Sequence, residues 1–298
     1  MIGMADLASI IASELTQPVD PRVASMAAAI AAQHPGAAQA VLFYGSCLRE
    51  RELEGRMLDF YLIVSDYRAA YAQRWLAIAN RLIPPNVFPF AFDELVAKYA
   101  VLSEADFIRE CGPSARSSSV YARFAQPARL VWLGDESMRK IIVAALSTAV
   151  TTLLGQTRAT MTADEASDAL SLWRKAFQYT YGAELRAERT SRPGAIIDGD
   201  PERYRALAAT VPDAGANDAA SANRADRGWR RIQRKGKWLS VARLAKASLT
   251  FSGGIDYLAW KINRHAGTNI EVRPWQRRWP LIGALILLPR LFARGAIR

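Results

Sequence analysis

The feature that most constrains the fold of this chain is a pair of apolar segments within residues 41–66, VLFYGSCLRERELEGRMLDFYLIVSD. The first segment covers residues 40–44 and stops at Gly45-Ser46, and the second covers residues 57–64. Apolar runs of this length, bounded by turn residues, are typical of β-strands. Glycine lets the backbone approach a ligand closely, and the amide and hydroxyl that follow can face a phosphate. The stretch therefore predicts two strands around a loop suited to phosphate.

A single carboxylate, Asp59, interrupts the second apolar segment. Because side chains alternate between the two faces of a strand, we expect Asp59 to share a face with Tyr61 and Ile63. The other face should carry Leu58, Phe60, Leu62 and Val64. Burying a carboxylate is costly unless it has a partner, and in a phosphate site the usual partner is a cation. Asp59 is therefore a candidate metal ligand.

Composition limits the class of protein and the kind of metal. The 298 residues are 51% hydrophobic and 22% charged, which predicts a folded chain of two packed units. Cys47 and Cys111 are too few and too far apart for a zinc site or a disulfide framework, and Cys47 is expected to be a buried, inert thiol. The only histidines are His34 and His265, which excludes a histidine-based metal cage. Any metal should be a hard cation held by oxygen.

Positive charge is concentrated in the last quarter of the chain. Residues 224–298 contain 17 Lys and Arg against three acids, a net charge of +14, so the rest carries −3 of the total of +11. Such a basic region indicates an anionic partner surface, either membrane or nucleic acid. No recognition motif accompanies the basic run at 227–237, so no specific nucleic acid is expected. The first residues, MIGMADLASIIASEL, lack the basic start of a signal or transit peptide.

The tail, RPWQRRWPLIGALILLPRLFARGAIR, combines arginine, tryptophan and a short apolar core at residues 281–288. That core is too short to span a bilayer, so no transmembrane helix is expected here. Tryptophan at the interface, apolar residues within it and arginine at the headgroups are typical of a monotopic membrane anchor. The alternative is a C-terminal helix docked on the core or on the partner in a homodimer.

The whole pattern predicts an α+β fold with a mixed sheet and flanking helices, followed by helices alone. Strands are expected at residues 40–44, 57–64, 87–92, 95–102 and 129–132. Helices are expected at residues 21–33, 67–82, 103–111, 137–154, 163–189, 239–250 and 255–265. Polar loops are expected at residues 112–119 and 213–223. We expect a domain at 1–134, a helical domain at 135–223 and a basic C-terminal segment at 224–298.

Gly45-Ser46 on one strand and Asp59 on the next resemble the DNA polymerase β-like nucleotidyltransferases. A narrower resemblance is carried by YGSCLRE with MLDFYLIVSD, KYAVLSEADFI, VYARFAQPARLVW, YTYGAELRAE and SVARLAKASLTFSGGIDYLAWKINR. In their order and spacing these segments are similar to the mitochondrial-type CDP-diacylglycerol synthases. That family comprises peripheral phosphatidate cytidylyltransferases, also called translocator maintenance proteins.

The resemblance implies roles for residues that match the family's motifs. Gly45 and Ser46 would hold the phosphates of CTP, and Asp59 would be the principal Mg²⁺ ligand. Lys98 and Arg123 would offset the charge of the triphosphate. The alternative is that Lys98 and Arg123 are solvated charges on the surface.

Three further residues have weaker assignments in the same resemblance. Glu184 and Arg186 would face the cleft from the helical domain, or else belong to an exposed helix face. Asp66 would be a second metal carboxylate, or else the cap of the next helix.

The implied reaction is the Mg²⁺-dependent transfer of CMP from CTP to phosphatidate, giving CDP-diacylglycerol and pyrophosphate. A phosphate monoester is already ionised near neutral pH, so the reaction requires no histidine base. Cationic groups would neutralise the developing charge while the site aligns nucleophile and leaving group. The lipid substrate implies a peripheral protein on the cytoplasmic face of the inner membrane, held on an anionic surface by its C-terminal segment.

The sequence departs from the family in several places. The family lacks a second acid two residues after the strand aspartate, and here that position is Tyr61, but Cys47 replaces a glycine. Ala122 and Ala183 also replace glycines, Glu184 replaces an aspartate, and the family's Trp-His pair is missing after the strand. Two alternatives therefore stay open. One is a nucleotidyltransferase with another nucleotide or acceptor, and the other is an inactive basic protein that binds membrane or nucleic acid.

Overall fold

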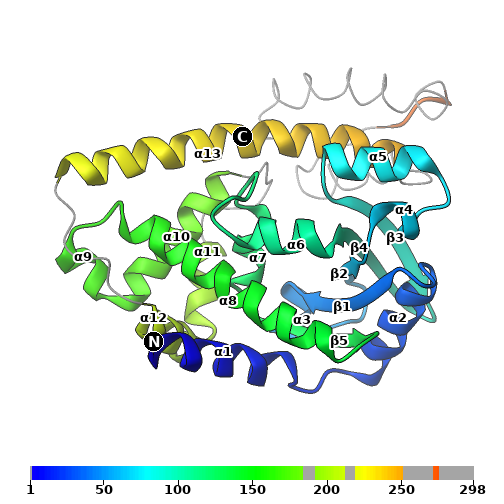
Figure 1. Cartoon of the computed structure of the whole chain (residues 1–298), viewed down its shortest axis with the longest axis horizontal. Coiled ribbons are helices and arrows are strands. Elements are labelled where there is room, and N and C mark those ends of the chain that lie inside the picture. Colours follow the sequence, from blue (N-terminus) through cyan, green and yellow to red (C-terminus); the bar gives the residue numbers. More distant parts are fainter. Residues whose placement is uncertain (1, 184–191, 212–218, 251–270, 275–298) are drawn as a thin grey trace.

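A five-stranded sheet lies at the centre of the first half of the chain (Figure 1). The computed structural model describes residues 2–183, 192–211, 219–250 and 271–274. The strands are β1 (Ala38–Tyr44), β2 (Met57–Val64), β3 (Asn86–Phe92), β4 (Leu95–Ser103) and β5 (Ala128–Leu133). Their order is β3-β4-β2-β1-β5, with β2 parallel to β4 and the other neighbours antiparallel. The predicted α+β class with a mixed sheet is confirmed.

The two faces of the sheet carry separate hydrophobic cores, as the alternation in β2 predicts. On one face Phe60 and Leu62 pack with Met26 of α2 (Pro21–Ala32). On the other face Tyr61 and Ile63 share a core with α1 (Ile2–Leu15). Helix α2 begins as expected, because Pro21 occupies its first turn and Asp20 accepts a hydrogen bond from the Arg22 amide at 2.9 Å.

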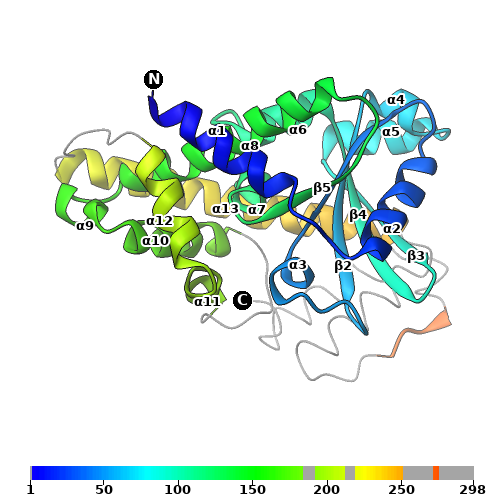
Figure 2. The same cartoon turned by 90° about the horizontal axis from the view of Figure 1, so that it is seen from below.

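Short helices connect the strands around the sheet (Figure 2). They are α3 (Ser46–Glu50), α4 (Tyr67–Ala70), α5 (Arg74–Leu82), α6 (Glu104–Cys111) and α7 (Ser119–Phe124). Ser103 caps α6 by accepting from the Asp106 amide at 3.3 Å, which confirms the predicted helix start.

The second half of the chain is helical throughout the described residues. Its helices are α8 (Ser137–Arg158), α9 (Ala163–Ser167), α10 (Ala169–Gly182), α11 (Arg192–Asp198), α12 (Pro201–Thr210) and α13 (Ala219–Thr250). Trp173 of α10 and Tyr204 of α12 belong to the same hydrophobic cluster as Leu42 of β1. One core therefore extends from the sheet into the helices beyond residue 134.

Helix α8 is the one helix, among the residues described, that is long and apolar enough to cross a membrane by length and composition. However, 56% of its apolar window is buried inside the protein. It packs against α1, α6, α7 and α10, which is the environment of a core helix.

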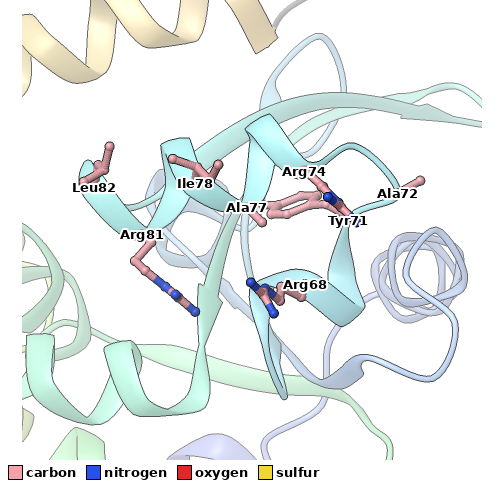
Figure 3. Close-up of a pocket in the computed structure, with 8 residues that line it drawn as sticks. All are labelled: Arg68, Tyr71, Ala72, Arg74, Ala77, Ile78, Arg81 and Leu82. Atoms are coloured by element: carbon pink, nitrogen blue, oxygen red, sulfur yellow. The ribbon is translucent and has the colours of Figure 1, made fainter.

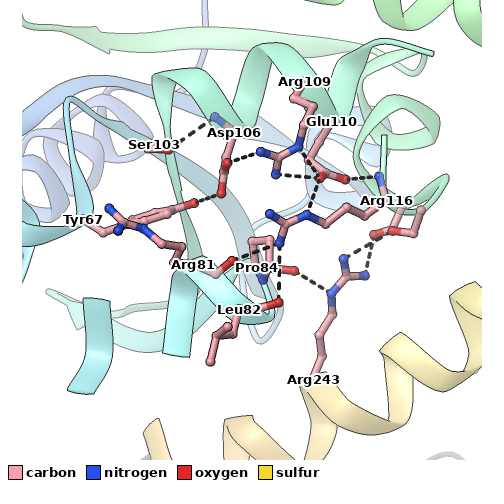
Figure 4. A network of polar contacts seen from close by, with 12 residues as sticks. Tyr67, Arg81, Leu82, Pro84, Ser103, Asp106, Arg109, Glu110, Arg116 and Arg243 are labelled. Atoms are coloured by element: carbon pink, nitrogen blue, oxygen red, sulfur yellow. Dashed lines mark hydrogen bonds and ion pairs between the residues drawn. The ribbon is translucent and has the colours of Figure 1, made fainter. Parts of the chain in front are cut away.

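Helix α13 lies along one side of the molecule, and its far end reaches β3 and the segment between α5 and β3 (Figure 1). Trp229 anchors its first half, because its ring stacks on Tyr179 at 4.8 Å and its indole N–H donates to the Gln156 carbonyl at 3.1 Å. Arg243 anchors the second half by donating to the Pro84 carbonyl at 2.7 Å and to two serine hydroxyls (Figure 4). The basic run before residue 238 is thus part of a docked helix.

Three predicted boundaries need correction. The expected helix at 67–82 is broken between α4 and α5, because Tyr71 is extended (φ −128°, ψ 125°) and its buried ring contacts His34. The expected helix at 163–189 is broken at Asp168, which instead caps α10 by accepting from two backbone amides. Residues 219–223, expected in a loop, belong to α13. The predicted helix at 255–265 lies outside the described residues.

Candidate functional site

Asp59 and Lys98 meet on adjacent parallel strands. The register of β2 and β4 pairs these two residues directly, and Lys98 Nζ lies 2.8 Å from Asp59 Oδ1. Their side chains are 19% and 31% exposed, so the ion pair is accessible from solvent but mostly shielded from it. In the structure, the Lys98 ammonium group is the partner that the shielded Asp59 carboxylate requires.

Gly45 brings the end of β1 against the same carboxylate. Its φ of +95° is one that L side chains rarely adopt, and a Cβ atom added there would lie 2.9 Å from Asp59 Oδ2. Glycine is therefore required twice, for backbone conformation and for close approach. Ser46 follows as the first residue of α3. The structure thus brings together Gly45, Ser46, Asp59 and Lys98.

The position two residues after Asp59 is filled by an aromatic cluster. Tyr61 is 2% exposed, and its ring lies 5.3 Å from that of Tyr44 and 5.1 Å from that of Phe124. An acid at this position would be buried among rings. Asp59 is therefore the carboxylate that β2 offers to a ligand, and the cluster forms an apolar wall beside it.

Arg123 is carried by α7, whose Phe124 packs against Tyr61 on the face of the sheet that bears Asp59. The half-buried Arg123 guanidinium donates to the Ser119 carbonyl of its own helix at 2.6 Å. Its proposed contact with a triphosphate stays a prediction.

Asp66 lies beyond the opposite end of β2 from Asp59. It caps α4 by accepting from the Arg68 amide at 2.6 Å, and its carboxylate is 3.9 Å from the Arg81 guanidinium. At about 3.3 Å per residue, the distance along β2 from Asp59 to Val64 alone is about 17 Å. The two carboxylates cannot share one cation, so the helix-cap alternative for Asp66 is the one that the geometry supports.

Glu184 and Arg186 lie outside the described residues, as does the predicted anchor at 281–288. Cys47 is a buried thiol, 2% exposed, that donates to the Met57 carbonyl, and burial raises its pKa. It behaves as the expected inert cysteine rather than as a nucleophile.

The arrangement suits a magnesium ion that arrives with phosphate. No cluster of three His, Cys, Asp or Glu side chains occurs within the part of the chain that the structure describes. Mg²⁺ often uses only one or two carboxylates, with water and substrate phosphates as its other ligands. Asp59 supplies one such carboxylate, and Lys98 already holds a positive charge beside it.

A second charged cluster lies around α6 and was missed by sequence reasoning (Figure 4). Asp106 accepts from the Tyr67 hydroxyl at 2.6 Å and pairs with Arg109 at 2.6 Å. Glu110, only 1% exposed, pairs with Arg109 and accepts from the Arg116 amide at 3.1 Å. Both acids are satisfied by partners within the protein, so we interpret this cluster as structural.

A groove of about 490 Å³ lies at α4 and α5 (Figure 3). It is lined by Arg68, Tyr71, Ala72, Arg74, Ala77, Ile78, Arg81 and Leu82. All of these residues follow the C-terminal end of β2, whereas Asp59 is close to its start. The groove is therefore separate from the candidate site.

Comparison with known proteins does not assign the chain to a family. No family model matches the chain, and none of the curated proteins is similar to it. Among solved structures, the chain is similar to a nucleotidyltransferase-like protein from Exiguobacterium sibiricum 255-15, with 10% identity over 92% of this chain and 91% of that one. The TM-score is 0.29. This likeness shows nothing about substrates or site residues, so function must be inferred from the contacts of this chain.

Proposed function

We propose that this protein is a Mg²⁺-dependent nucleotidyltransferase that transfers CMP from CTP to phosphatidate. The observation that carries the proposal is the convergence of Asp59, Lys98 and Gly45 at one end of the sheet. It supplies a carboxylate for a cation, an ammonium group for phosphate oxygens, and a backbone that can approach a ligand without a side chain in the way.

Each residue has a distinct role in this proposal. Asp59 would hold the cation that accompanies the triphosphate, and the Lys98 side chain would then turn from the carboxylate to phosphate oxygens. Gly45 and Ser46 present backbone and hydroxyl groups to the triphosphate. Arg123, on the neighbouring α7, adds a further positive charge. Bound Mg²⁺ would neutralise charge on the triphosphate as pyrophosphate leaves.

The acceptor in the proposal is a phosphate monoester that needs alignment rather than deprotonation. Its oxygen attacks the α-phosphorus of CTP, the bond to the β-phosphate oxygen breaks, and pyrophosphate departs. Fixed positive charge near the reacting phosphates favours this step, because the two anions otherwise repel each other. The backbone of Lys98 is fixed by the pairing of two sheet strands, so only its side chain has to move to reach the phosphates.

A lipid acceptor requires contact with a membrane, and the exposed face of α13 supports that part of the proposal. Between residues 224 and 237, every Lys and Arg is exposed, whereas Trp229 faces the protein. The exposed positive residues are Arg224, Arg227, Arg230, Arg231, Arg234, Lys235 and Lys237. Basic helices of this kind bind anionic headgroups. We propose that this face and the C-terminal tail hold the protein at the cytoplasmic face of the inner membrane.

A direct assay tests the reaction. Purified protein, Mg²⁺, labelled CTP and phosphatidate in mixed micelles should give CDP-diacylglycerol and pyrophosphate. Asp59→Asn should reduce turnover by at least a hundredfold without changing the circular dichroism spectrum. Asp66→Asn is the matched control, because asparagine also caps helices and Asp66 is remote from the site.

The outcomes separate the competing functions. Product from ATP, GTP or UTP instead of CTP, or from a water-soluble acceptor alone, would indicate another nucleotidyltransferase. If no nucleotide is transferred under conditions in which a control enzyme works, the remaining hypothesis is an inactive protein that binds membrane or nucleic acid. Removal of residues 279–298 should release the protein from anionic liposomes. Unchanged binding would show that the tail does not hold the protein at the membrane.

A further inference from the structure

Helix α5 turns an apolar stripe toward solvent. Trp75, Ile78 and Leu82 are between 44% and 69% exposed. At about 3.6 residues per turn, these three positions share one face of the helix. Of the six large hydrophobic side chains that are exposed in the described part of the chain, half therefore lie on a single short helix. Such a patch indicates a contact surface, and none of the roles proposed for the Asp59 site uses it.

The opposite face of α5 is held against the sheet, so the stripe is presented by a fixed helix. Asn80 is fully buried, donates to the Val101 carbonyl of β4 at 2.9 Å and accepts from the Asn86 amide. The Asn86 side chain donates in turn to the Leu76 carbonyl at 3.0 Å. Ala77 is also buried. The exposure of the outer face does not come from loose packing of the helix.

The groove beside α5 adds positive charge to the same surface (Figure 3). Arg68, Arg74 and Arg81 line it, and none of the described residues in its lining is acidic. The side chains of Arg68 and Arg81 point toward one another (Figure 3). Asp66 lies 3.9 Å from the Arg81 guanidinium, and solvent weakens this pair because both side chains are more than half exposed. Arg68 and Arg74 are exposed and pair with no acid that the structure describes.

The chemistry of this surface matches a bilayer that contains acidic lipids. Residues 67–92 contain three arginines and no acid, so the whole surface attracts an anionic partner. A bilayer of this kind presents phosphates at the headgroup level and an apolar boundary directly beneath them. Arginine reaches the phosphates, while tryptophan and aliphatic side chains enter the boundary. A protein partner would have to supply both acids and an apolar groove in the same arrangement.

The second half of α13 adjoins this surface. Arg243 donates to the Pro84 carbonyl, two residues after α5 ends, at 2.7 Å. Trp238 is exposed, and it follows the exposed Arg234 and Lys235 at helical spacing. The basic face of α13 therefore continues into an exposed aromatic ring on a helix that is tied to the segment after α5.

We infer that α5 and its groove bind the surface of an anionic bilayer. Trp75, Ile78 and Leu82 enter the headgroup boundary, and Arg68 and Arg81 bind the phosphate of an acidic phospholipid. The inference deepens the proposed function, on whose membrane contact it rests, by adding a contact in the first half of the chain. Two surfaces that are fixed relative to each other, α5 and α13, also set the orientation of the protein on the bilayer, which a single anchor would not.

The first test is co-sedimentation of the full chain with vesicles of phosphatidylcholine mixed with phosphatidylglycerol. Phosphatidylglycerol is not the proposed acceptor, so binding does not report on the reaction. Ile78→Gln with Leu82→Gln removes two apolar side chains from the contact and should weaken binding about tenfold or more. Arg68→Gln with Arg81→Gln should weaken it about twenty-five-fold, the product of two phosphate contacts. All four side chains are exposed, so the circular dichroism spectra should match that of the wild type.

The second test locates the contact independently of affinity. Cys47 and Cys111 are both buried, so a cysteine at position 78 can be labelled selectively. The emission of an environment-sensitive fluorophore on Ile78→Cys should shift to the blue when the vesicles are added. The same fluorophore on Ile108→Cys, an exposed position of α6 outside the groove, should show no shift.

Two matched controls separate this contact from general effects of charge and hydrophobicity. Arg139→Gln removes an exposed arginine of α8, and Ile108→Gln removes an exposed aliphatic side chain of α6. Both should bind the vesicles as the wild type does. Unchanged binding of the two α5 double variants, an equal loss in the controls, or no blue shift at position 78 would overturn the inference.

Two further outcomes would also overturn it. Equally tight binding to vesicles of phosphatidylcholine alone would remove the role of the arginines. A dimer that Ile78→Gln with Leu82→Gln dissociates in solution, with vesicle binding unchanged, would assign the stripe to a second copy of the chain.

The outcome for this inference can be told apart from the outcome for the proposed reaction. Weaker vesicle binding in the α5 variants supports the inference even if no nucleotide is transferred. Transfer of CMP by the wild type, together with unchanged vesicle binding in those variants, refutes the inference alone.

Discussion

The ion pair between Glu14 and Arg203 gives the sharpest prediction about stability. It joins α1 to α12 across 189 residues of sequence. Arg203 Nη2 lies 2.9 Å from Glu14 Oε2, its Nε contacts the other carboxylate oxygen, and its Nη1 donates to the Ala125 carbonyl at 3.1 Å. The two side chains are only 5% and 12% exposed, so water cannot replace a lost partner.

Replacing Glu14 by leucine should reduce the free energy of unfolding by about 3–5 kcal/mol, the cost of leaving one buried charge unpaired. Glu14→Gln keeps the shape and one acceptor, so it should lose about 2–3 kcal/mol. The double variant Glu14→Leu with Arg203→Met should lose less than Glu14→Leu alone, because it removes both charges.

Urea unfolding followed by circular dichroism at pH 7 measures these losses as shifts of the midpoint. Glu136→Gln is the matched control, since it breaks a pair with Arg139 in which the carboxylate is 73% exposed. No measurable loss is expected there. Equal midpoints for Glu14→Gln and Glu136→Gln would refute the reasoning, and so would a double variant that is less stable than Glu14→Leu.

Two further predictions concern Gly45 and His34. Gly45→Ala should lower the free energy of unfolding by about 1–3 kcal/mol because its φ is positive, and it should also lower turnover because the new methyl group displaces Asp59. Gly55→Ala is the control for backbone strain alone, since Gly55 has a φ of +65° but no atom within 4 Å of an added Cβ. Equal turnover in the two variants would contradict the contact with Asp59. Burial lowers the pKa of His34 in the folded protein, so the unfolded chain takes up a proton first and stability should fall as the pH drops below about 6.5. In urea unfolding experiments, His34→Gln should lose less stability than the wild type as the pH falls over that range. An equal pH dependence of stability in the two proteins would contradict this prediction.

Much of the local structure could be predicted because it depends on nearest neighbours in sequence. The alternation in β2 placed Asp59 on the face with Tyr61, and the structure has that arrangement. The Ser103 cap of α6 and the proline start of α2 are also local signals. The helix at 67–82 was not predicted correctly, because its break follows from the packing of the Tyr71 ring against distant residues.

In the candidate site, too, the unusual residues could be recognised from the sequence, but their contacts could not. Gly45 and Asp59 could be recognised as chemically unusual residues in apolar segments, but their contact depends on the antiparallel pairing of β1 with β2. Lys98 meets Asp59 only because β4 inserts parallel to β2 in this register.

The sequence by itself determined the strands, the helices α2, α6 and α8, the direction in which Asp59 points and the uneven charge. These properties follow from side-chain periodicity, capping and composition, which act over a few residues. Only the tertiary structure decided that Lys98 is the partner of Asp59, that Asp66 is a helix cap remote from it, and that Glu14 holds Arg203. Those contacts depend on strand register and on the packing of distant elements, and no short stretch of sequence specifies either.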